Sequence, residues 1–286
     1  MADPALKNAI RSGDLILAPG VFEMISALIA DEVGFKALYI TGYGTVASYL
    51  GLPDAGIATY SDMIDRVASI AGRTKTPVIA DADTGYGGLL NVRHTVRGYE
   101  NSGVTAIQLE DQEFPKKCGH TPNRRVVPLE DMIRKIEVAI DSRRSDDFLI
   151  IARTDARTGL GLDEAIKRGK AFAKAGADIV FVESPESEEE MQRIADEIDA
   201  PLMANIVNGG RTPLLSANTL QSLGFAVAIH PAIGFLSMGA ALKNAYADLY
   251  RNGETSKGID LYDFQQFNEL IGFPDIWEFE KKYVSA

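Results

Sequence analysis

The sequence predicts a (β/α)8 barrel, a closed barrel of eight parallel strands surrounded by helices. Short apolar runs recur along the chain, helix-length segments separate them, and glycine follows several of those segments. The runs are apolar almost throughout, as is typical of parallel strands covered on both faces. A doubly wound open sheet is the alternative. No Gly-x-Gly-x-x-Gly follows the first run, so a dinucleotide fold lacks its main sign.

Eight apolar runs of four to six residues supply the expected strands. They cover residues 15–18, 37–41, 77–81, 106–110, 148–153, 179–183, 201–205 and 226–230. The clearest helical patterns between them cover residues 61–70, 128–143, 162–175, 187–198 and 217–223. Ser61 is the expected N-cap of the first of these helices, and the acidic start of residues 187–198 suits the positive end of a helix dipole.

The segment after the eighth strand is longer than closing the barrel requires. Residues 237–250 have a helical pattern, and residues 260–283 contain seven aromatic side chains. These aromatic side chains need a surface to bury them, and a neighbouring subunit is the natural place. We expect one barrel domain over residues 1–286 that includes this tail, about residues 237–286.

The composition limits the partners that the protein can have. The chain has 29 basic and 40 acidic residues, a net charge of −11, which argues against nucleic acid and anionic membranes as partners. One cysteine cannot form an internal disulfide, which favours a reducing cytoplasm. The first residues lack the pattern of a signal peptide, and no run of about 18 uncharged apolar residues is present.

Polar residues follow most of the expected strands at their carboxyl ends. These residues include Thr41, Asp81, Asp83, Glu110, Asp111, Arg153, Asp155, Glu183 and Asn205. In a barrel these ends converge on one rim, which is the active-site face. A single such residue often only caps a loop, so the coincidence across strands is what favours a functional site.

Three of these residues predict a metal site. Asp81, Asp83 and Glu110 offer hard oxygen ligands, and no histidine lies near them in the sequence, which favours Mg²⁺ or Mn²⁺ over Zn²⁺. Arg153 at the end of a buried strand can bind a carboxylate or phosphate with both arms of its guanidinium. The alternative for Arg153 is an internal ion pair with Glu183 or Asp155.

The only cysteine, Cys118, follows two lysines and precedes Gly119 and His120. Nearby positive charge stabilises a thiolate, so this pattern is typical of a reactive thiol. The alternative is a basic surface loop that happens to contain a cysteine. A location directly after the fourth strand favours the reactive thiol, because it places Cys118 on the same rim as the acidic residues.

Four stretches of the sequence together resemble the isocitrate lyase/phosphoenolpyruvate mutase superfamily. They are residues 81–88, 110–112, 116–120 and 152–156. The stretch 116–120 points to the carbon–carbon lyase branch of this superfamily, and the likeness runs through nearly the whole chain. The resemblance implies a homotetramer in which the C-terminal helices are exchanged between subunits.

The resemblance also implies a role for each site residue. Asp81 would bind Mg²⁺ most directly, with the other metal residues acting mainly through water: Asp83, Glu110 and Asp54. The substrate would be bound by Thr41, Gly42, Tyr43, Gly119, Arg153, Glu183, Asn205 and Thr212. Lys116, Cys118, Gly119 and His120 would lie on a mobile gating loop, where Cys118 protonates the departing carbanion. Tyr43 or Tyr39 is a candidate for the general base.

The activity implied by the resemblance is Mg²⁺-dependent cleavage of a 2-hydroxy-dicarboxylate to pyruvate, or another 2-oxo acid, and a carboxylate. A 2-alkylmalate such as 2,3-dimethylmalate is the expected substrate, and 2-methylisocitrate is the alternative. Oxaloacetate hydrolysis and phosphonate chemistry are further alternatives. Members that hydrolyse oxaloacetate carry a serine where this chain has Pro231, and proline has no hydroxyl to hold a hydrated ketone.

Overall fold

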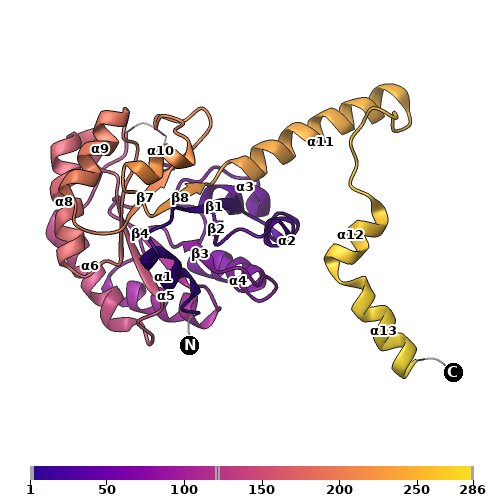
Figure 1. Ribbon diagram of the computed structural model, residues 1–286, viewed down its shortest axis with the longest axis horizontal. Coiled ribbons are helices and arrows are strands. Elements are labelled where there is room, and N and C mark those ends of the chain that lie inside the picture. The colour runs from indigo at the N-terminus through magenta and orange to yellow at the C-terminus, as the bar shows by residue number, and fades with distance from the viewer. Residues whose placement is uncertain (1–2, 120, 122, 285–286) are drawn as a thin grey trace. The chain divides into compact units, whose positions relative to one another are not determined.

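The computed structural model describes residues 3–119, 121 and 123–284. Eight parallel strands follow one another around a closed barrel, and the last strand pairs with the first (Figure 1). The strands are β1 (Ile16–Val21), β2 (Leu38–Ile40), β3 (Val78–Asp81), β4 (Ala106–Glu110), β5 (Leu149–Thr154), β6 (Ile179–Val182), β7 (Leu202–Asn205) and β8 (Val227–His230). The predicted barrel is therefore confirmed, and the open-sheet alternative is wrong.

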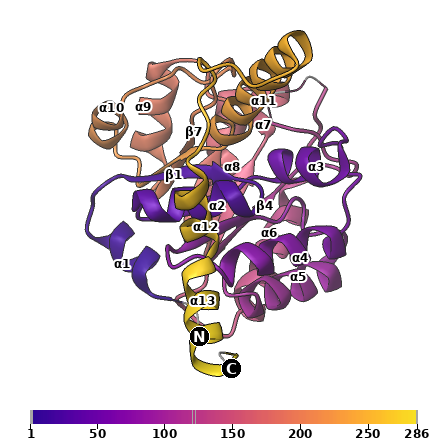
Figure 2. The ribbon, with the colours of Figure 1, turned by 90° about the vertical axis from the view of Figure 1, so that its right-hand side faces the viewer.

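Helices cover the outside of the barrel. They are α1 (Ala5–Arg11), α2 (Met24–Val33), α3 (Gly42–Leu50), α4 (Tyr60–Ala71), α5 (Leu89–Asn101), α6 (Leu129–Ser142), α7 (Ala156–Leu160), α8 (Leu162–Lys174), α9 (Glu188–Glu197) and α10 (Ala217–Ser222). After β8 the chain continues into α11 (Ile233–Asn252). Figure 2 shows α3, α4 and α5 beside one another on this outer layer. Two sequence interpretations need correction. Thr59, and not Ser61, is the N-cap of α4, and β1 continues through Pro19 and Gly20 to Val21.

Apolar side chains fill two layers. One cluster fills the inside of the barrel and includes Ile79, Leu149 and Phe181, and the larger cluster lies between the strands and the helices. Because both faces of each strand are buried, the strands are apolar along most of their length. Polar side chains are left to the carboxyl ends of the strands, which positions them together at one mouth of the barrel.

The chain divides into two compact units, residues 1–234 and residues 235–286. The second unit contains most of α11 together with α12 (Phe264–Ile271) and α13 (Phe273–Tyr283). Neither α12 nor α13 has a buried residue, so this unit does not cover its own aromatic side chains, such as Phe264 and Trp277. Within the described residues, none of the helices has both the length and the apolar character that crossing a bilayer requires.

Candidate active site

Four carboxylates lie at the carboxyl-end mouth of the barrel. Asp81 ends β3, Asp83 follows it, Glu110 ends β4, and Asp54 lies between α3 and α4. Each is at most 9% exposed. Asp83 has a φ of 50°, a left-handed conformation that is uncommon for a residue other than glycine, and its backbone N–H donates to Asp81 Oδ1 at 3.0 Å. The backbone after β3 therefore bends and holds Asp83 close to the Asp81 carboxylate.

Lys116 places its ammonium group among these carboxylates. Its Nζ lies 2.6 Å from Asp54 Oδ1 and 2.5 Å from Asp83 Oδ1. Burial raises the pKa of the Asp83 carboxyl to about 7, and the charge of Lys116 opposes this rise. Burial also lowers the pKa of Lys116, but Asp83 and Asp54 outweigh that effect and hold it well above its ordinary value. The loop lysine is therefore a charged partner of the acidic group.

The chemistry of these side chains fits a hard divalent cation. Glu110 Oε1 is buried and has no hydrogen-bond partner among the described residues, while Oε2 lies 3.5 Å from Arg153 Nη1. Burial raises the pKa of Glu110 well above its ordinary value, against the charge of Arg153. Oxygen ligands of this kind suit Mg²⁺ and Mn²⁺. Within the described part of the chain, no three acidic, histidine or cysteine side chains are gathered as a ready-made metal site.

The start of α3 faces Asp81. Thr41 is the N-cap of this helix, and the Gly42 N–H donates to Asp81 Oδ2 at 3.2 Å. A Cβ at position 42 would lie 2.6 Å from the same oxygen, so only glycine allows this approach. Tyr43 follows and is 41% exposed. The segment predicted to bind a carboxylate therefore lies beside the acidic group, with backbone donors at a helix N-terminus.

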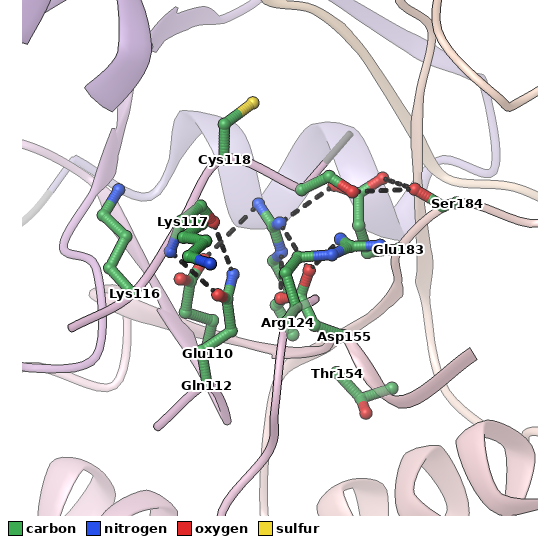
Figure 3. A network of polar contacts seen from close by, with 12 residues as sticks. Glu110, Gln112, Lys116, Lys117, Cys118, Arg124, Thr154, Asp155, Glu183 and Ser184 are labelled. Atoms are coloured by element: carbon green, nitrogen blue, oxygen red, sulfur yellow. Dashed lines mark hydrogen bonds and ion pairs between the residues drawn. The ribbon is translucent and has the colours of Figure 1, made fainter. Parts of the chain in front are cut away.

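Arg153, at the end of β5, is the centre of a second charged group. Its Nε and Nη2 donate to the two carboxylate oxygens of Asp155, each at 2.9 Å, and Nη2 lies 3.2 Å from Glu183 Oε2. Arg124 Nη1 reaches the same Asp155 at 2.5 Å (Figure 3). The internal ion pair considered as the alternative for Arg153 is confirmed. Its guanidinium is held rigidly at the mouth of the barrel, which is also what binding an anionic substrate requires.

The loop of residues 112–125, named the lid loop for its predicted role, lies against these groups at its described residues, 112–119, 121 and 123–125. The Gln112 side chain holds the Lys117 backbone with two hydrogen bonds, of 2.8 and 3.0 Å. The Cys118 N–H donates to the Asp54 carbonyl at 3.2 Å, and Ser184 Oγ donates to the Gly119 carbonyl at 3.1 Å. In Figure 3 the thiol of Cys118 points away from the charged network around Arg124. The loop is thus docked on the rim by its backbone, and its thiol is half-buried.

The remaining predicted residues lie around this mouth or near it. Glu183 follows β6 and accepts a hydrogen bond from Asn205 Nδ2 at 3.0 Å. Thr212 is buried, and its hydroxyl has no hydrogen-bond partner in the described residues. Pro231 follows β8, and its backbone packs closely against Gly20. His120 lies outside the described residues.

Tyr39 is a poor candidate for the general base. Burial raises the pKa of its hydroxyl well above the ordinary value, and the charge of Asp81 raises it further. A base must first lose its own proton, and Tyr39 keeps that proton and donates it to Gln108 Oε1 at 2.9 Å.

Three residues that hold the lid loop and its surroundings had no role predicted from the sequence. They are Gln112, Arg124 and Ser184. Gln112 and Ser184 follow the ends of β4 and β6, so the rule that selected their neighbours could have found them. Arg124 lies far from any strand end, and no pattern in the sequence pairs it with Asp155.

Comparisons with known proteins address the family. A family described as "Phosphoenolpyruvate phosphomutase" matches residues 6–250. The chain is 45% identical to 2,3-dimethylmalate lyase of Eubacterium barkeri over 283 residues, which cover 98% of both chains. It is 39% identical to 2-methylisocitrate lyase of Aeropyrum pernix, over 94% of this chain and 87% of the relative.

The chain belongs to the phosphoenolpyruvate mutase/isocitrate lyase superfamily. A crystal structure of 2,3-dimethylmalate lyase from this superfamily matches with a TM-score of 0.92 and 36% identity, over 99% of this chain and 96% of that one. The family and the lyase class expected from the sequence are confirmed by these relatives.

Two further similar structures carry ligands. Oxaloacetate acetylhydrolase in complex with the inhibitor 3,3-difluorooxalacetate matches with a TM-score of 0.93 and 35% identity, over 99% of this chain and 97% of that one. Phosphonopyruvate hydrolase in complex with oxalate and Mg²⁺ matches with a TM-score of 0.89 and 29% identity, over the whole of both chains.

Proposed function

We propose that this protein is a lyase that breaks the C2–C3 bond of a 2-hydroxy-dicarboxylate, with a 2-alkylmalate such as 2,3-dimethylmalate as the first candidate. The observation that carries the proposal is the lid loop with its single cysteine. Lys116 reaches the acidic group, and Gly119 docks beside Arg153 and Glu183. The 45% identity to a 2,3-dimethylmalate lyase over nearly the whole chain supports this choice of substrate.

Mg²⁺ is the proposed cofactor, with Mn²⁺ as a substitute. Asp81, Asp83, Glu110 and Asp54 would hold the ion, because they are buried oxygen ligands gathered at one mouth of the barrel. When bound, the ion would supply Lewis-acid polarisation of the substrate's C2 oxygen. A related structure with bound Mg²⁺ and oxalate is consistent with this assignment.

The protein's own groups would bind the substrate and exclude water. The N–H groups at the start of α3 would donate to the C1 carboxylate, and Arg153 would donate to a second anionic oxygen. Glu183 and Asn205 would orient that oxygen from the neighbouring strand ends. A docked lid loop would keep water from the site during the reaction.

Two protons move in the proposed reaction. A base, for which Tyr43 is the candidate, takes the proton of the C2 hydroxyl. The C2–C3 electron pair then stays on C3, and C2 becomes the ketone carbon of the 2-oxo acid. Cys118 gives its Sγ proton to C3, and the second carboxylate is released. The thiol must therefore turn toward the substrate from the orientation in Figure 3.

The test is the variant Cys118→Ser, assayed by pyruvate formation from 2,3-dimethylmalate. Removing a general acid lowers turnover by roughly two to four orders of magnitude. Calorimetric titration with Mn²⁺ is the control, since Cys118 is not among the proposed metal ligands. Unchanged turnover in this variant would disprove the acid role. Full turnover after the metal has been removed with EDTA would disprove the cofactor assignment.

A second candidate substrate is 2-methylisocitrate, which is favoured by the 39% identity to a lyase named for it. The two substrates differ by a third carboxylate, so a panel of both with the same pyruvate assay separates them. Oxaloacetate hydrolysis ranks lower, because Pro231 offers no hydroxyl, although an oxaloacetate acetylhydrolase shares the fold. Phosphonopyruvate belongs in the same panel as the test of phosphonate chemistry.

The C-terminal tail and the single cysteine support proposals on assembly and location. We propose a homotetramer in which the aromatic C-terminal helices are exchanged between subunits. The exposed aromatic side chains of α12 and α13 support this proposal. We also propose a cytoplasmic location, because a single cysteine that cannot form an internal disulfide is typical of proteins in a reducing compartment.

A further inference from the structure

A cavity of about 740 Å³ lies beside the lid loop. Its walls come from the two arms of the lid loop (residues 112–117 and 123–125), from the middle of α7 at Thr158, and from Arg211 in the segment after β7. None of the proposed metal residues lines it, and neither does Cys118. Cavities of this size hold small organic ligands in other proteins.

The charge on the cavity wall is opposite to that of the protein. Lys117, Arg124, Arg125 and Arg211 line the cavity, against one acid, Glu113. The whole chain has a net charge of −11, so its average surface repels anions. An acidic protein can concentrate an anion only where basic side chains are gathered locally.

Two features leave this positive charge available to a ligand. None of the carboxylates in the described residues forms an ion pair with Lys117, which is exposed. Arg125 pairs with Glu113 at 2.8 Å and Arg211 pairs with Glu186 at 3.5 Å, but these arginine side chains are 80% and 37% exposed, and water weakens such pairs. Arg124 is buried and its charge is balanced by Asp155, so its part is to fix this wall of the cavity, through hydrogen bonds of 2.5 and 2.6 Å to Asp155 and Thr158.

We propose that this cavity binds a small polyvalent anion, a polycarboxylate or a phosphate, and that the bound anion holds the lid loop against the barrel. The anion would bridge the two arms of the loop, at Lys117 and Arg125, to Arg211 on the barrel. Cys118 lies between these arms. The Asp155 carboxylate links this cavity to the catalytic mouth, since it binds both Arg124 and Arg153. The inference does not depend on which substrate is cleaved.

Isothermal titration calorimetry at a fixed free Mg²⁺ concentration tests the binding. Tricarballylate and pyrophosphate are the two probes, and acetate at equal ionic strength is the monovalent control. The double variant R125Q/R211Q removes two cavity charges, and R93Q/R97Q removes two exposed arginines of α5 as the matched control. We expect the cavity variant to bind at least one probe roughly tenfold more weakly than the wild type or the control. The probe that binds more tightly identifies the source of the anion.

Alkylation of Cys118 by iodoacetamide reports the lid loop directly, because the chain has no other cysteine. The tighter probe should slow alkylation several-fold in the wild type and in R93Q/R97Q, and should have no such effect in R125Q/R211Q. Protection that persists in R125Q/R211Q would mean that the anion occupies the catalytic mouth, and this would overturn the proposal. Equal binding by all three proteins, no binding at millimolar concentrations, or an equal effect of acetate would overturn it as well. None of these readouts requires turnover, so the outcome is separate from that of the lyase assay.

Discussion

Gly119 is the residue on which docking of the lid loop depends. A Cβ at this position would collide with Arg153 Nη2 and would lie 2.7 Å from Glu183 Oε2. Both neighbours are buried and held by other groups, so they cannot move aside without breaking the charged network. A side chain at position 119 would therefore lift the loop away from the rim.

The variant Gly119→Ala should lower kcat/KM by roughly a hundredfold, because a displacement of about 1 Å at a site of this kind costs about that much. The variant Gly72→Ala is the control, since Gly72 ends α4 with a φ of −74°, which alanine adopts without strain, and it lies away from the carboxyl ends of the strands. Steady-state kinetics with 2,3-dimethylmalate measures the effect, and circular dichroism checks that both variants are folded. If Gly119→Ala also kept the wild-type kcat/KM, docking of the loop at Gly119 would not be required for catalysis.

Asp83 predicts a pH dependence of metal binding. Burial raises the pKa of this carboxyl to about 7, against the charge of Lys116. A ligand carboxyl must lose its proton before it binds a cation, so protons compete with the metal below pH 7 and not above it. The apparent Mn²⁺ affinity should fall by roughly tenfold per pH unit below 7 and level off above it. Electron paramagnetic resonance titrations at pH 5.5, 6.5 and 8 measure this, and equal affinities at all three values would contradict the assignment.

At the scale of elements, α4 depends on its N-terminal cap. The Thr59 hydroxyl accepts from the Asp62 N–H at 3.3 Å, and Asp62 Oδ2 accepts from the Thr59 N–H at 2.8 Å. This reciprocal pair is a capping box. Thr59→Ala should therefore lower the free energy of unfolding by about 1 kcal/mol.

Ser61→Ala is the matched control for this cap. Ser61 lies inside α4 and is exposed, and alanine favours helix there by a few tenths of a kcal/mol. Urea unfolding followed by circular dichroism should give a lower midpoint for Thr59→Ala alone. A larger loss for Ser61→Ala than for Thr59→Ala would restore Ser61 as the cap.

The strands could be predicted because a strand that is buried on both faces needs an apolar residue at nearly every position. A short apolar run is what a parallel strand in a barrel requires, and all eight such runs became strands. Helix α3 gave no such signal, because its sequence contains two glycines and β-branched residues. It is fixed instead by the Thr41 cap and by Gly51 in the left-handed conformation at its end.

The site could be predicted only in part for a related reason. Residues at strand ends, such as Asp81, Glu110 and Arg153, are brought together by the barrel itself, so knowing the fold is enough. The contact of Lys116 with Asp54 and Asp83, and that of Arg124 with Asp155, depend on the path of the lid loop. That path is fixed by single hydrogen bonds such as those of Gln112, and no sequence period encodes them.

At the scale of the whole molecule, the aromatic tail predicts the assembly. Phe264 is 79% exposed and Trp277 is 49% exposed, and the second unit buries no side chain of α12 or α13. An aromatic side chain covers about 150–250 Å² when it is buried, and each Å² of apolar surface contributes about 25 cal/mol. Several such side chains packed on other subunits would stabilise an oligomer by many kcal/mol.

The double variant Phe264→Asp and Trp277→Asp should therefore dissociate the tetramer, because it places two charges in the apolar contact. Leu214→Asp is the control, as it introduces the same charge at an apolar residue that is 57% exposed on the barrel unit. Light scattering at micromolar concentrations should give the mass of four chains for the wild type and the control, and a smaller mass for the double variant. A wild-type protein with the mass of one 31.0 kDa chain would show that the tail is covered in some other way.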